Sequence, residues 1–168
     1  MSGNEIAVKC SGITKTFGGV VANDDINLEV KYGEILALLG ENGSGKTTLM
    51  NMLSGIYHPD KGTIAISGKT VAINSPKDSI ALGIGMIHQH FKLVEVFTAA
   101  DNIVAGTKGS LKGKGAVRDE INKISEQLGL EVDPDKKVYN MSVSEKQTVE
   151  ILKVLYRGAK ILILDEPT

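Results

Sequence analysis

A glycine-rich segment, Gly40–Thr47, constrains the fold of this chain more than any other feature. Its letters GENGSGKT match the pattern G-x-x-x-x-G-K-[ST] without a gap. The apolar stretch Glu34–Leu39 precedes it, as expected of an interior parallel strand, and Thr47–Ser54 has the composition of a helix. Glycines allow backbone N–H groups to turn inward around an anion, and the N-terminus of a helix favours the same anion. The segment therefore predicts a phosphate-binding loop between a strand and a helix.

Two side chains of this loop have specific roles in the predicted site. Lys46 places a positive charge at the β- and γ-phosphates of a nucleotide, and the Thr47 hydroxyl is a ligand for Mg²⁺. The alternative is a glycine-rich strand-to-helix turn with an exposed lysine. The predicted nucleotide contacts are Gly40, Glu41, Asn42, Gly43, Ser44, Gly45, Lys46, Thr47 and Thr48.

A second motif lies at the far end of the chain, where the apolar run Ile161–Leu164 is followed by two acidic residues. Such a run predicts a strand buried on both faces. A carboxylate at the tip of a neighbouring strand can hold the Mg²⁺ shell, which is the role predicted for Asp165. Glu166 can take a proton from an attacking water. Without the phosphate loop, a capped strand end would be the better interpretation.

Charge and composition exclude several classes of protein. The 19 basic and 20 acidic residues nearly cancel, so no global basic field attracts nucleic acid, and phosphate binding must be local. The single cysteine, Cys10, excludes an intramolecular disulfide and fits a reducing compartment. No apolar run approaches the roughly 18 residues that a membrane span needs. These features predict a cytoplasmic protein without a nucleic-acid partner.

The hydrophobic pattern changes along the chain from strand to helix. Ile6–Lys9, Ile13–Phe17 and Ile26–Val30 alternate apolar and polar residues, which predicts half-buried antiparallel strands. Val117–Leu128 and Ser142–Tyr156 carry apolar residues at three- and four-residue spacing, which predicts helices. Further short elements are predicted at Thr63–Ile66, Pro76–Leu82 and Ile84–Ile87.

With both motifs in view, the chain resembles the ATPase subunit of ATP-binding cassette (ABC) transporters. Four landmarks occur in the family's order: Gly40–Thr47, Gln89, Met141–Glu145 and Leu164–Thr168. The resemblance implies an α/β fold with a P-loop NTPase core, an N-terminal antiparallel β-subdomain and a helical subdomain. It places the β-subdomain and core at about 1–97, the helical subdomain at about 98–157 and the last core strand at 158–168. The cassette is expected to be cut after its catalytic glutamate.

The resemblance also assigns roles outside the loop. Gln89 would reach the Mg²⁺ and the attacking water, Glu166 would be the catalytic glutamate, and Asp165 would be the Mg²⁺-associated aspartate. Phe17 stands where the family places an aromatic side chain that stacks on adenine. A polar loop residue is the alternative for Gln89, and a core or hairpin aromatic is the alternative for Phe17.

The segment Ser142, Val143, Ser144 and Glu145 occupies the family's signature position, which contacts the γ-phosphate held by a partner cassette. Ser142 and Glu145 have the spacing of a capping box, so an ordinary helix cap is the alternative. Ser144 replaces a glycine of the family's pattern, and Thr148 replaces an arginine. A side chain at Ser144 crowds the approach of backbone to phosphate, which predicts weakened hydrolysis.

The segments around Gln89, Thr98–Ile103 and Val149–Leu152 resemble the first cassette of simple-sugar and nucleoside importers. The resemblance implies an ATPase that couples MgATP binding and hydrolysis to import through transmembrane permease subunits, at the inner face of the membrane. Its partners would be a second cassette, in a head-to-tail dimer or fused tandem, and indirectly a solute-binding protein. Two alternatives stay open: a cassette that binds ATP without independent turnover, and a soluble cassette ATPase acting in translation or DNA repair.

Overall fold

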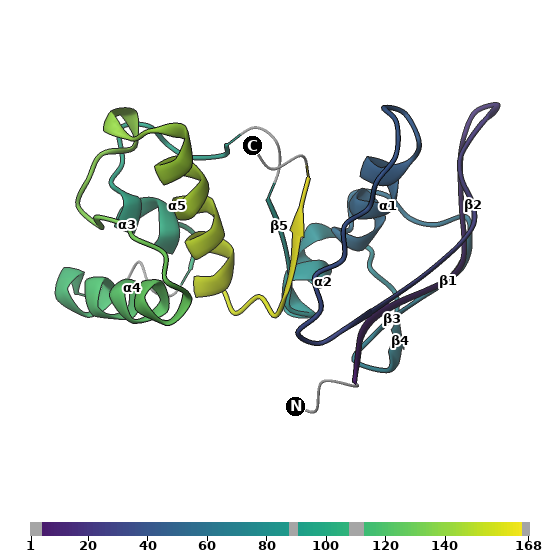
Figure 1. Ribbon diagram of the computed structural model, residues 1–168, viewed down its shortest axis with the longest axis horizontal. Helices are drawn as coiled ribbons and strands as arrows, with labels where there is room; N and C mark the ends of the chain where they lie inside the picture. Colours follow the sequence, from purple (N-terminus) through teal and green to yellow (C-terminus); the bar gives the residue numbers. More distant parts are fainter. Residues whose placement is uncertain (1–4, 88–90, 108–112, 166–168) are drawn as a thin grey trace. The chain divides into compact units, whose positions relative to one another are not determined.

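The computed structural model describes residues 5–87, 91–107 and 113–165, and the chain divides into two compact units. The first unit is Met1–Ile84 and the second is Gly85–Thr168. Within the described residues, the first unit holds a four-stranded sheet and two α-helices, whereas the second is mainly helical (Figure 1). The predicted domain limits at about 97 and 157 remain predictions.

A long hairpin organises the first unit. Strand β1 (Ile6–Phe17) pairs antiparallel with β2 (Val20–Lys31), and Gly18, with φ of +57°, makes the turn that the sequence predicts. The two strands predicted before this turn are one continuous strand. Its register shifts between Cys10 and Ile13, where Gly12 adopts φ of +63°. A β-bulge at this glycine bends the strand without ending it.

The sheet of the first unit has the order β2-β1-β3-β4. Strands β3 (Lys61–Ile66) and β4 (Lys69–Val71) complete it, and helices α1 (Lys46–Leu53) and α2 (Pro76–Ala81) accompany it. Apolar side chains of β1, β3 and α1 make up most of the buried core of this unit. They are Ala7, Val8, Cys10, Ile13, Leu49, Met52, Leu53, Ile64 and Ile66.

The predicted interior strand over Glu34–Leu39 is wrong for the described structure. No strand lies between β2 and α1, and the side chains of Ile35 and Leu39 are 97% and 93% exposed. An interior strand forms only where neighbouring strands take up its N–H and C=O groups. None of the strands in the described residues pairs with this segment, so its apolar composition alone does not make it a strand.

A two-stranded sheet accompanies the helices of the second unit. Strands β5 (Ile84–Ile87) and β6 (Ile161–Leu164) have the predicted limits and pair with each other. The expectation that β6 is buried on both faces is wrong: Ile163 is buried, but Leu162 and Leu164 are 38% and 37% exposed. Within the described residues β6 has β5 as its one partner strand, and no side chain on its other face is packed as fully as Ile163.

Among its described residues, the rest of the second unit is mainly helical, with α3 (Ala99–Val104), α4 (Lys114–Leu128), the 3-10 turn η2 (Val138–Asn140) and α5 (Val143–Tyr156). Their apolar faces form one core, made of Ala99, Ile103, Val104, Val117, Ile121, Val138, Met141, Val149 and Leu152. In the part of the chain that the structure describes, no helix has the length and apolar character to cross a membrane. The predicted combination of an antiparallel sheet with a helical subdomain is confirmed.

Candidate functional site

The glycines of the Gly40–Thr47 loop permit a backbone that other residues would block. Gly43 and Gly45 have φ of +83° and +88°, in the left-handed region that L side chains rarely adopt. A Cβ atom on Gly45 would lie 2.2 Å from the carbonyl oxygen of Ala22 in β2. Glycine is therefore required at this position both for its conformation and for the close packing of the loop on β2.

The Lys46 ammonium group folds back over the loop. Its Nζ donates to the carbonyl oxygens of Gly40 at 2.7 Å and Glu41 at 2.8 Å, and to Ser44 Oγ at 3.2 Å. All three acceptors are neutral, so these bonds orient the ammonium group without neutralising its charge. Phosphate oxygens that enter the loop can replace these acceptors and gain a charge-assisted hydrogen bond.

The N-terminus of α1 also favours binding of an anion. Its N-cap residue, Gly45, has no side chain to accept from the first backbone N–H groups, and the first turn holds no acidic residue. The positive end of the helix dipole is therefore available to an external anion. Thr47, in this first turn, is exposed. The loop, the ammonium group and the uncapped helix fit a bound triphosphate, and the hydroxyl of Thr47 is a suitable Mg²⁺ ligand.

Asn23 of β2 supports this loop, and no motif of the sequence marks this residue. Its Nδ2 donates to the Gly45 carbonyl oxygen at 3.2 Å, and the residue is buried. Its Oδ1 is buried without a hydrogen-bond partner among the described residues. Asn23 lies before the predicted strand Ile26–Val30, so the sequence pattern indicated neither its place in β2 nor its partner 22 residues away.

Phe17 lies at the end of β1, in the predicted adenine-stacking position. Its ring packs edge-on against Tyr57, with centroids 5.0 Å apart, and Lys15 Nζ lies 5.4 Å from its centroid. Lys15 also pairs with Asp60 at 2.8 Å, and this hydrogen bond is the main reason that the pKa of Asp60 is lowered. The Phe17 side chain remains 41% exposed. Stacking of adenine on the Phe17 ring remains a prediction. In this structure the ring already packs against Tyr57.

The other predicted catalytic positions lie on the second unit. Asp165 follows β6 directly, and its backbone N–H donates to the Ile87 carbonyl oxygen of β5 at 3.1 Å. Gln89 and Glu166 lie outside the described residues, so their roles stay predictions. The phosphate loop belongs to the first unit and Asp165 to the second.

The segment Ser142–Glu145 forms the N-terminus of α5. Ser142 Oγ accepts from the Glu145 N–H at 3.2 Å, and Glu145 Oε2 accepts from the Ser142 N–H at 2.8 Å, so the predicted capping box is confirmed. Lys136 donates to Glu145 Oε1 at 2.6 Å, and chiefly this bond lowers the pKa of Glu145 to about 2. Val143 is exposed. Contact with a partner's γ-phosphate remains a prediction for this segment.

Comparison with known proteins identifies the family. The sequence pattern of the ABC transporter family matches residues 23–168. The chain is 52% identical to the nucleoside import ATP-binding protein NupA of Lactococcus lactis and 52% identical to the guanosine import ATP-binding protein NupO of Bacillus subtilis. Both matches cover 98% of this chain and 33% of the relative. The chain thus spans about a third of the length of these curated relatives.

Comparison with a solved structure indicates the same family from the fold. The cbiO1 protein of Clostridium perfringens, described as part of the ABC transporter complex cbiONQ, superimposes with a TM-score of 0.83 at 29% identity. The match covers 98% of this chain and 67% of cbiO1. The order of the motifs, the geometry of the loop and both comparisons agree. The chain therefore belongs to the ABC transporter family, and its fold is that of an ATP-binding cassette.

Proposed function

We propose that this chain binds MgATP at the Gly40–Thr48 loop as the nucleotide-binding part of an importer. The observation that carries the proposal is the Lys46 ammonium group, held by three neutral loop oxygens beside an uncapped helix N-terminus. Mg²⁺ neutralises charge on the β- and γ-phosphates when it is bound. Thr47, Gln89 and Asp165 are the proposed ligands or second-sphere partners of the metal, and Phe17 is the proposed adenine contact.

Turnover in the complete protein requires groups from both units and a second cassette. Glu166 accepts the proton of the attacking water, and Gln89 orients that water. Ser142–Glu145 of a paired cassette closes over the γ-phosphate, so each nucleotide is held between two cassettes, in a head-to-tail dimer or a fused tandem. Ser142, Val143 and Ser144 at the N-terminus of α5 are exposed, so a nucleotide held by a second cassette can reach them.

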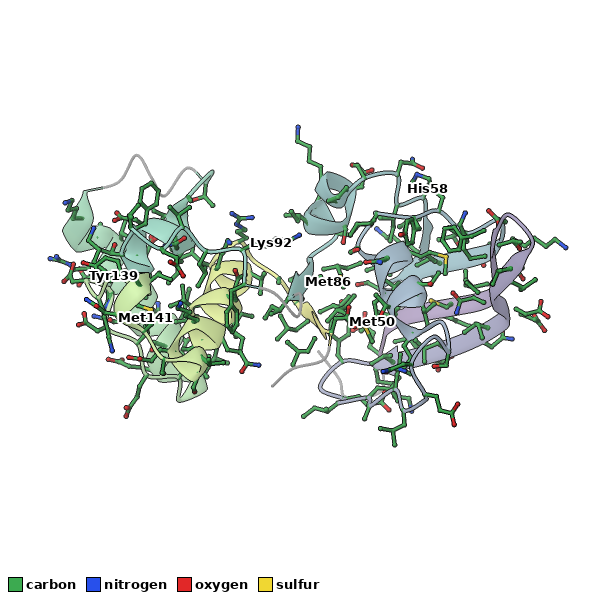
Figure 2. All side chains as sticks on the ribbon, turned by 90° about the horizontal axis from the view of Figure 1, so that it is seen from above. Met50, His58, Met86, Lys92, Tyr139 and Met141 are labelled. Atoms are coloured by element: carbon green, nitrogen blue, oxygen red, sulfur yellow. The ribbon has the colours of Figure 1, made fainter. Side chains whose placement is uncertain are left out.

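The permease contact is proposed for an apolar surface of the second unit. Lys137 Nζ donates to the Val96 carbonyl oxygen, and the Val138 N–H donates to that of Phe97, so the segments around Val96 and Tyr139 lie together. Val96, Phe97 and Tyr139 are exposed there (Tyr139 is labelled in Figure 2). Apolar groups gathered on an exposed surface favour protein contact. This surface would hold the protein at the inner face of the membrane.

The proposed cargo is a sugar or a nucleoside, delivered to the permease by a solute-binding protein. The names of the two relatives, which specify nucleoside and guanosine import, favour a nucleoside. Co-purification of the full-length protein with a membrane permease supports the transport proposal. Co-purification with ribosomes or DNA-repair proteins instead would favour a soluble cassette ATPase.

Nucleotide titration tests the binding proposal directly. Lys46→Ala removes the charged donor of the loop, and we expect ATP affinity to fall at least about 30-fold, because hydrogen bonds to charged groups contribute about 1.5–3 kcal/mol each. Lys69→Ala, on the exposed strand β4, is the matched control and should bind ATP as the wild type does. Equal affinity of the Lys46→Ala variant and the wild type would contradict the proposal.

A second function, ATP binding without turnover, is favoured by the signature helix itself. Ser144 has a side chain where the family's pattern has glycine, and its carbonyl oxygen accepts from Thr148 Oγ1 at 3.2 Å. If this crowding weakens hydrolysis, Ser144→Gly in the full-length protein raises kcat. If the wild type already turns over ATP and Ser144→Gly leaves kcat unchanged, this second candidate is wrong.

A further inference from the structure

The peptide that joins Gly45 to Lys46 lies at the point where the phosphate loop ends and α1 begins. The Gly45 carbonyl oxygen accepts from the Leu49 N–H at 3.0 Å, which is the first backbone hydrogen bond of the helix. The same oxygen accepts from Asn23 Nδ2 of β2 at 3.2 Å. Two donors, one from the helix and one from the strand, therefore hold this carbonyl group.

The direction of this carbonyl group also fixes the direction of an N–H group. The described peptide bonds are all trans, and a trans peptide is planar, with its C=O and N–H bonds pointing in opposite directions. Because the Gly45 carbonyl is directed at Leu49 and Asn23, the Lys46 N–H points out of the N-terminal end of α1. At such an end, anions bind to backbone N–H groups. The bond from Asn23 thus aims one of the backbone donors available to a phosphate.

Glycine at position 45 makes a second restraint on this peptide useful. Gly45 has φ of 88° and ψ of 1°, a conformation that glycine adopts readily, but glycine also rotates more freely than any other residue. Hydrogen bonds at the ends of helices open more readily than those in the middle. The bond from Leu49 alone is therefore a weak restraint. The amide group of Asn23 adds a restraint that comes from the sheet.

The Asn23 side chain can make this bond in one orientation only. Its nitrogen is a donor and its oxygen is an acceptor, so the reversed amide would place Oδ1 against the Gly45 carbonyl oxygen. In the observed orientation Oδ1 has no hydrogen-bond partner among the described residues, and Asn23 is only 5% exposed. A buried acceptor without a partner lowers the stability of a fold. Stability by itself therefore disfavours asparagine at this position.

We propose that Asn23 is a positioning residue, which aims the Lys46 N–H at the phosphates of the bound nucleotide. Leucine has as many side-chain heavy atoms as asparagine and would leave no acceptor unpaired, but it could not hold the Gly45 carbonyl group. The unpaired Oδ1 is then explained by the need for Nδ2 at the loop. This inference rests on the proposed function, in which the loop binds MgATP.

Isothermal titration with ATP tests the positioning role. For Asn23→Leu we expect the affinity to fall about three- to tenfold, because one hydrogen bond contributes roughly that factor. Asn23→Ala, which is too small to clash with its surroundings, should show the same loss. Affinities within about twofold of the wild type in both variants overturn the proposal.

Asn27→Leu is the matched control for these titrations. It makes the same change in the same strand, at an exposed residue that bonds to the backbone of Gly12 and Asp25. Its ATP affinity should stay within about twofold of the wild type. If Asn27→Leu weakens ATP binding as much as Asn23→Leu does, any disturbance of β2 explains the loss and the proposed role of Asn23 is wrong.

The stability of the Asn23→Leu variant distinguishes positioning from support of the fold. Its urea midpoint should equal or exceed that of the wild type, since the unpaired acceptor is removed. An asparagine that serves only the fold would show the opposite pattern, with a lower midpoint and unchanged affinity. A lower midpoint counts against the proposal in either case, because general weakening of the unit then explains a loss of affinity.

Inorganic tripolyphosphate separates the phosphates of ATP from its base. Asn23 acts on a donor to phosphate, so Asn23→Leu should lower the affinities for ATP and for tripolyphosphate by the same factor. Phe17→Ala, at the proposed adenine contact, should lower the affinity for ATP alone. If Asn23→Leu weakens ATP binding but leaves tripolyphosphate binding within about twofold of the wild type, the proposed role is wrong.

Hydrogen exchange of the nucleotide-free chain keeps this proposal apart from the proposed function. In Asn23→Leu the Leu49 amide should exchange at least about threefold faster, because its acceptor has lost a second donor, while amides of the β1–β3 pair stay unchanged. Unchanged exchange at Leu49 overturns the positioning role even if the chain binds ATP. If the wild type binds neither ATP nor tripolyphosphate and Leu49 exchange still accelerates, the proposed function is wrong and the positioning of the peptide is supported.

Discussion

The two units build their functional segments in different ways. In the first, the phosphate loop depends on backbone conformation: glycines at positive φ, an uncapped helix and one lysine. In the second, the proposed signature segment and the chain before α3 depend on side chains that bond to backbone: the Ser142–Glu145 capping box, Asn102 on Val94 and Glu150 on Lys92. A site of the first kind is recognisable in a short stretch of sequence, whereas a site of the second kind requires the folded helices.

This contrast has a consequence for mutation. A binding loop that depends on backbone conformation should lose most of its ATP affinity when a side chain is introduced at one of its required glycines. The rest of the unit should stay folded. A unit held by buried polar side chains should lose stability when one of them is removed, because its backbone partners are left unsatisfied. The largest effects on binding are expected in the first unit and the largest effects on folding in the second.

Gly45→Ala should have the largest effect. Its Cβ would lie 2.2 Å from the Ala22 carbonyl oxygen at a φ of +88°, so the loop cannot keep its conformation. We expect ATP affinity to fall at least about 100-fold, which corresponds to about 2.7 kcal/mol, in an isothermal titration. Gly33→Ala is the matched control, since it has a φ of +79° but no atom within 4 Å of the added Cβ. If Gly33→Ala lowered ATP affinity as much as Gly45→Ala does, backbone strain anywhere in the unit would explain the loss. The proposed difference between the two units would then be wrong.

Asn102→Ala should have the next largest effect, and on stability. The Val94 N–H and C=O groups lose their partner, buried Asn102, in a part-buried site, which costs about 1–2 kcal/mol in the free energy of unfolding of the second unit. Urea unfolding followed by hydrogen exchange in α3 and α5 measures it. Asn27→Ala, an exposed asparagine of β2, should cost less than about 1 kcal/mol. Comparable losses in the two variants would contradict the contrast.

The smallest effect concerns the charge of Glu145. The pKa of Glu145 is lowered to about 2 from the ordinary value of 4.5, mainly by the hydrogen bond from Lys136. Its contribution to stability is therefore present above pH 4.5 and is lost as the pH falls from 4.5 towards 2. Glu145→Gln keeps the capping box but loses the charge, so its unfolding midpoint should converge with that of the wild type over this range. Lys136→Met should reduce the pH dependence of stability between pH 4.5 and 2. If that dependence is unchanged, a carboxylate other than Glu145 is responsible for it.

Local elements were predictable because their determinants lie within a few residues. The turn at Gly18, strands β5 and β6, and the capping box of α5 all follow from neighbouring residues. The prediction of a strand over Glu34–Leu39 was wrong, because apolar composition indicates a preference for burial but does not say whether a partner strand is present. The continuity of β1 was missed for a related reason, since Gly12 can mark either a turn or a bulge.

By itself the sequence determined the family, the phosphate loop and the order of the functional segments, because these depend on glycine, lysine and hydroxyl groups at fixed local spacing. Only the tertiary structure decided which buried polar residues support them. Asn23 meets Gly45 across 22 residues, and Glu150 meets Lys92 across 58. A side chain's own neighbours in the sequence do not reveal a hydrogen bond of that kind, because the partner is chosen by the packing of strands and helices and not by spacing along the chain.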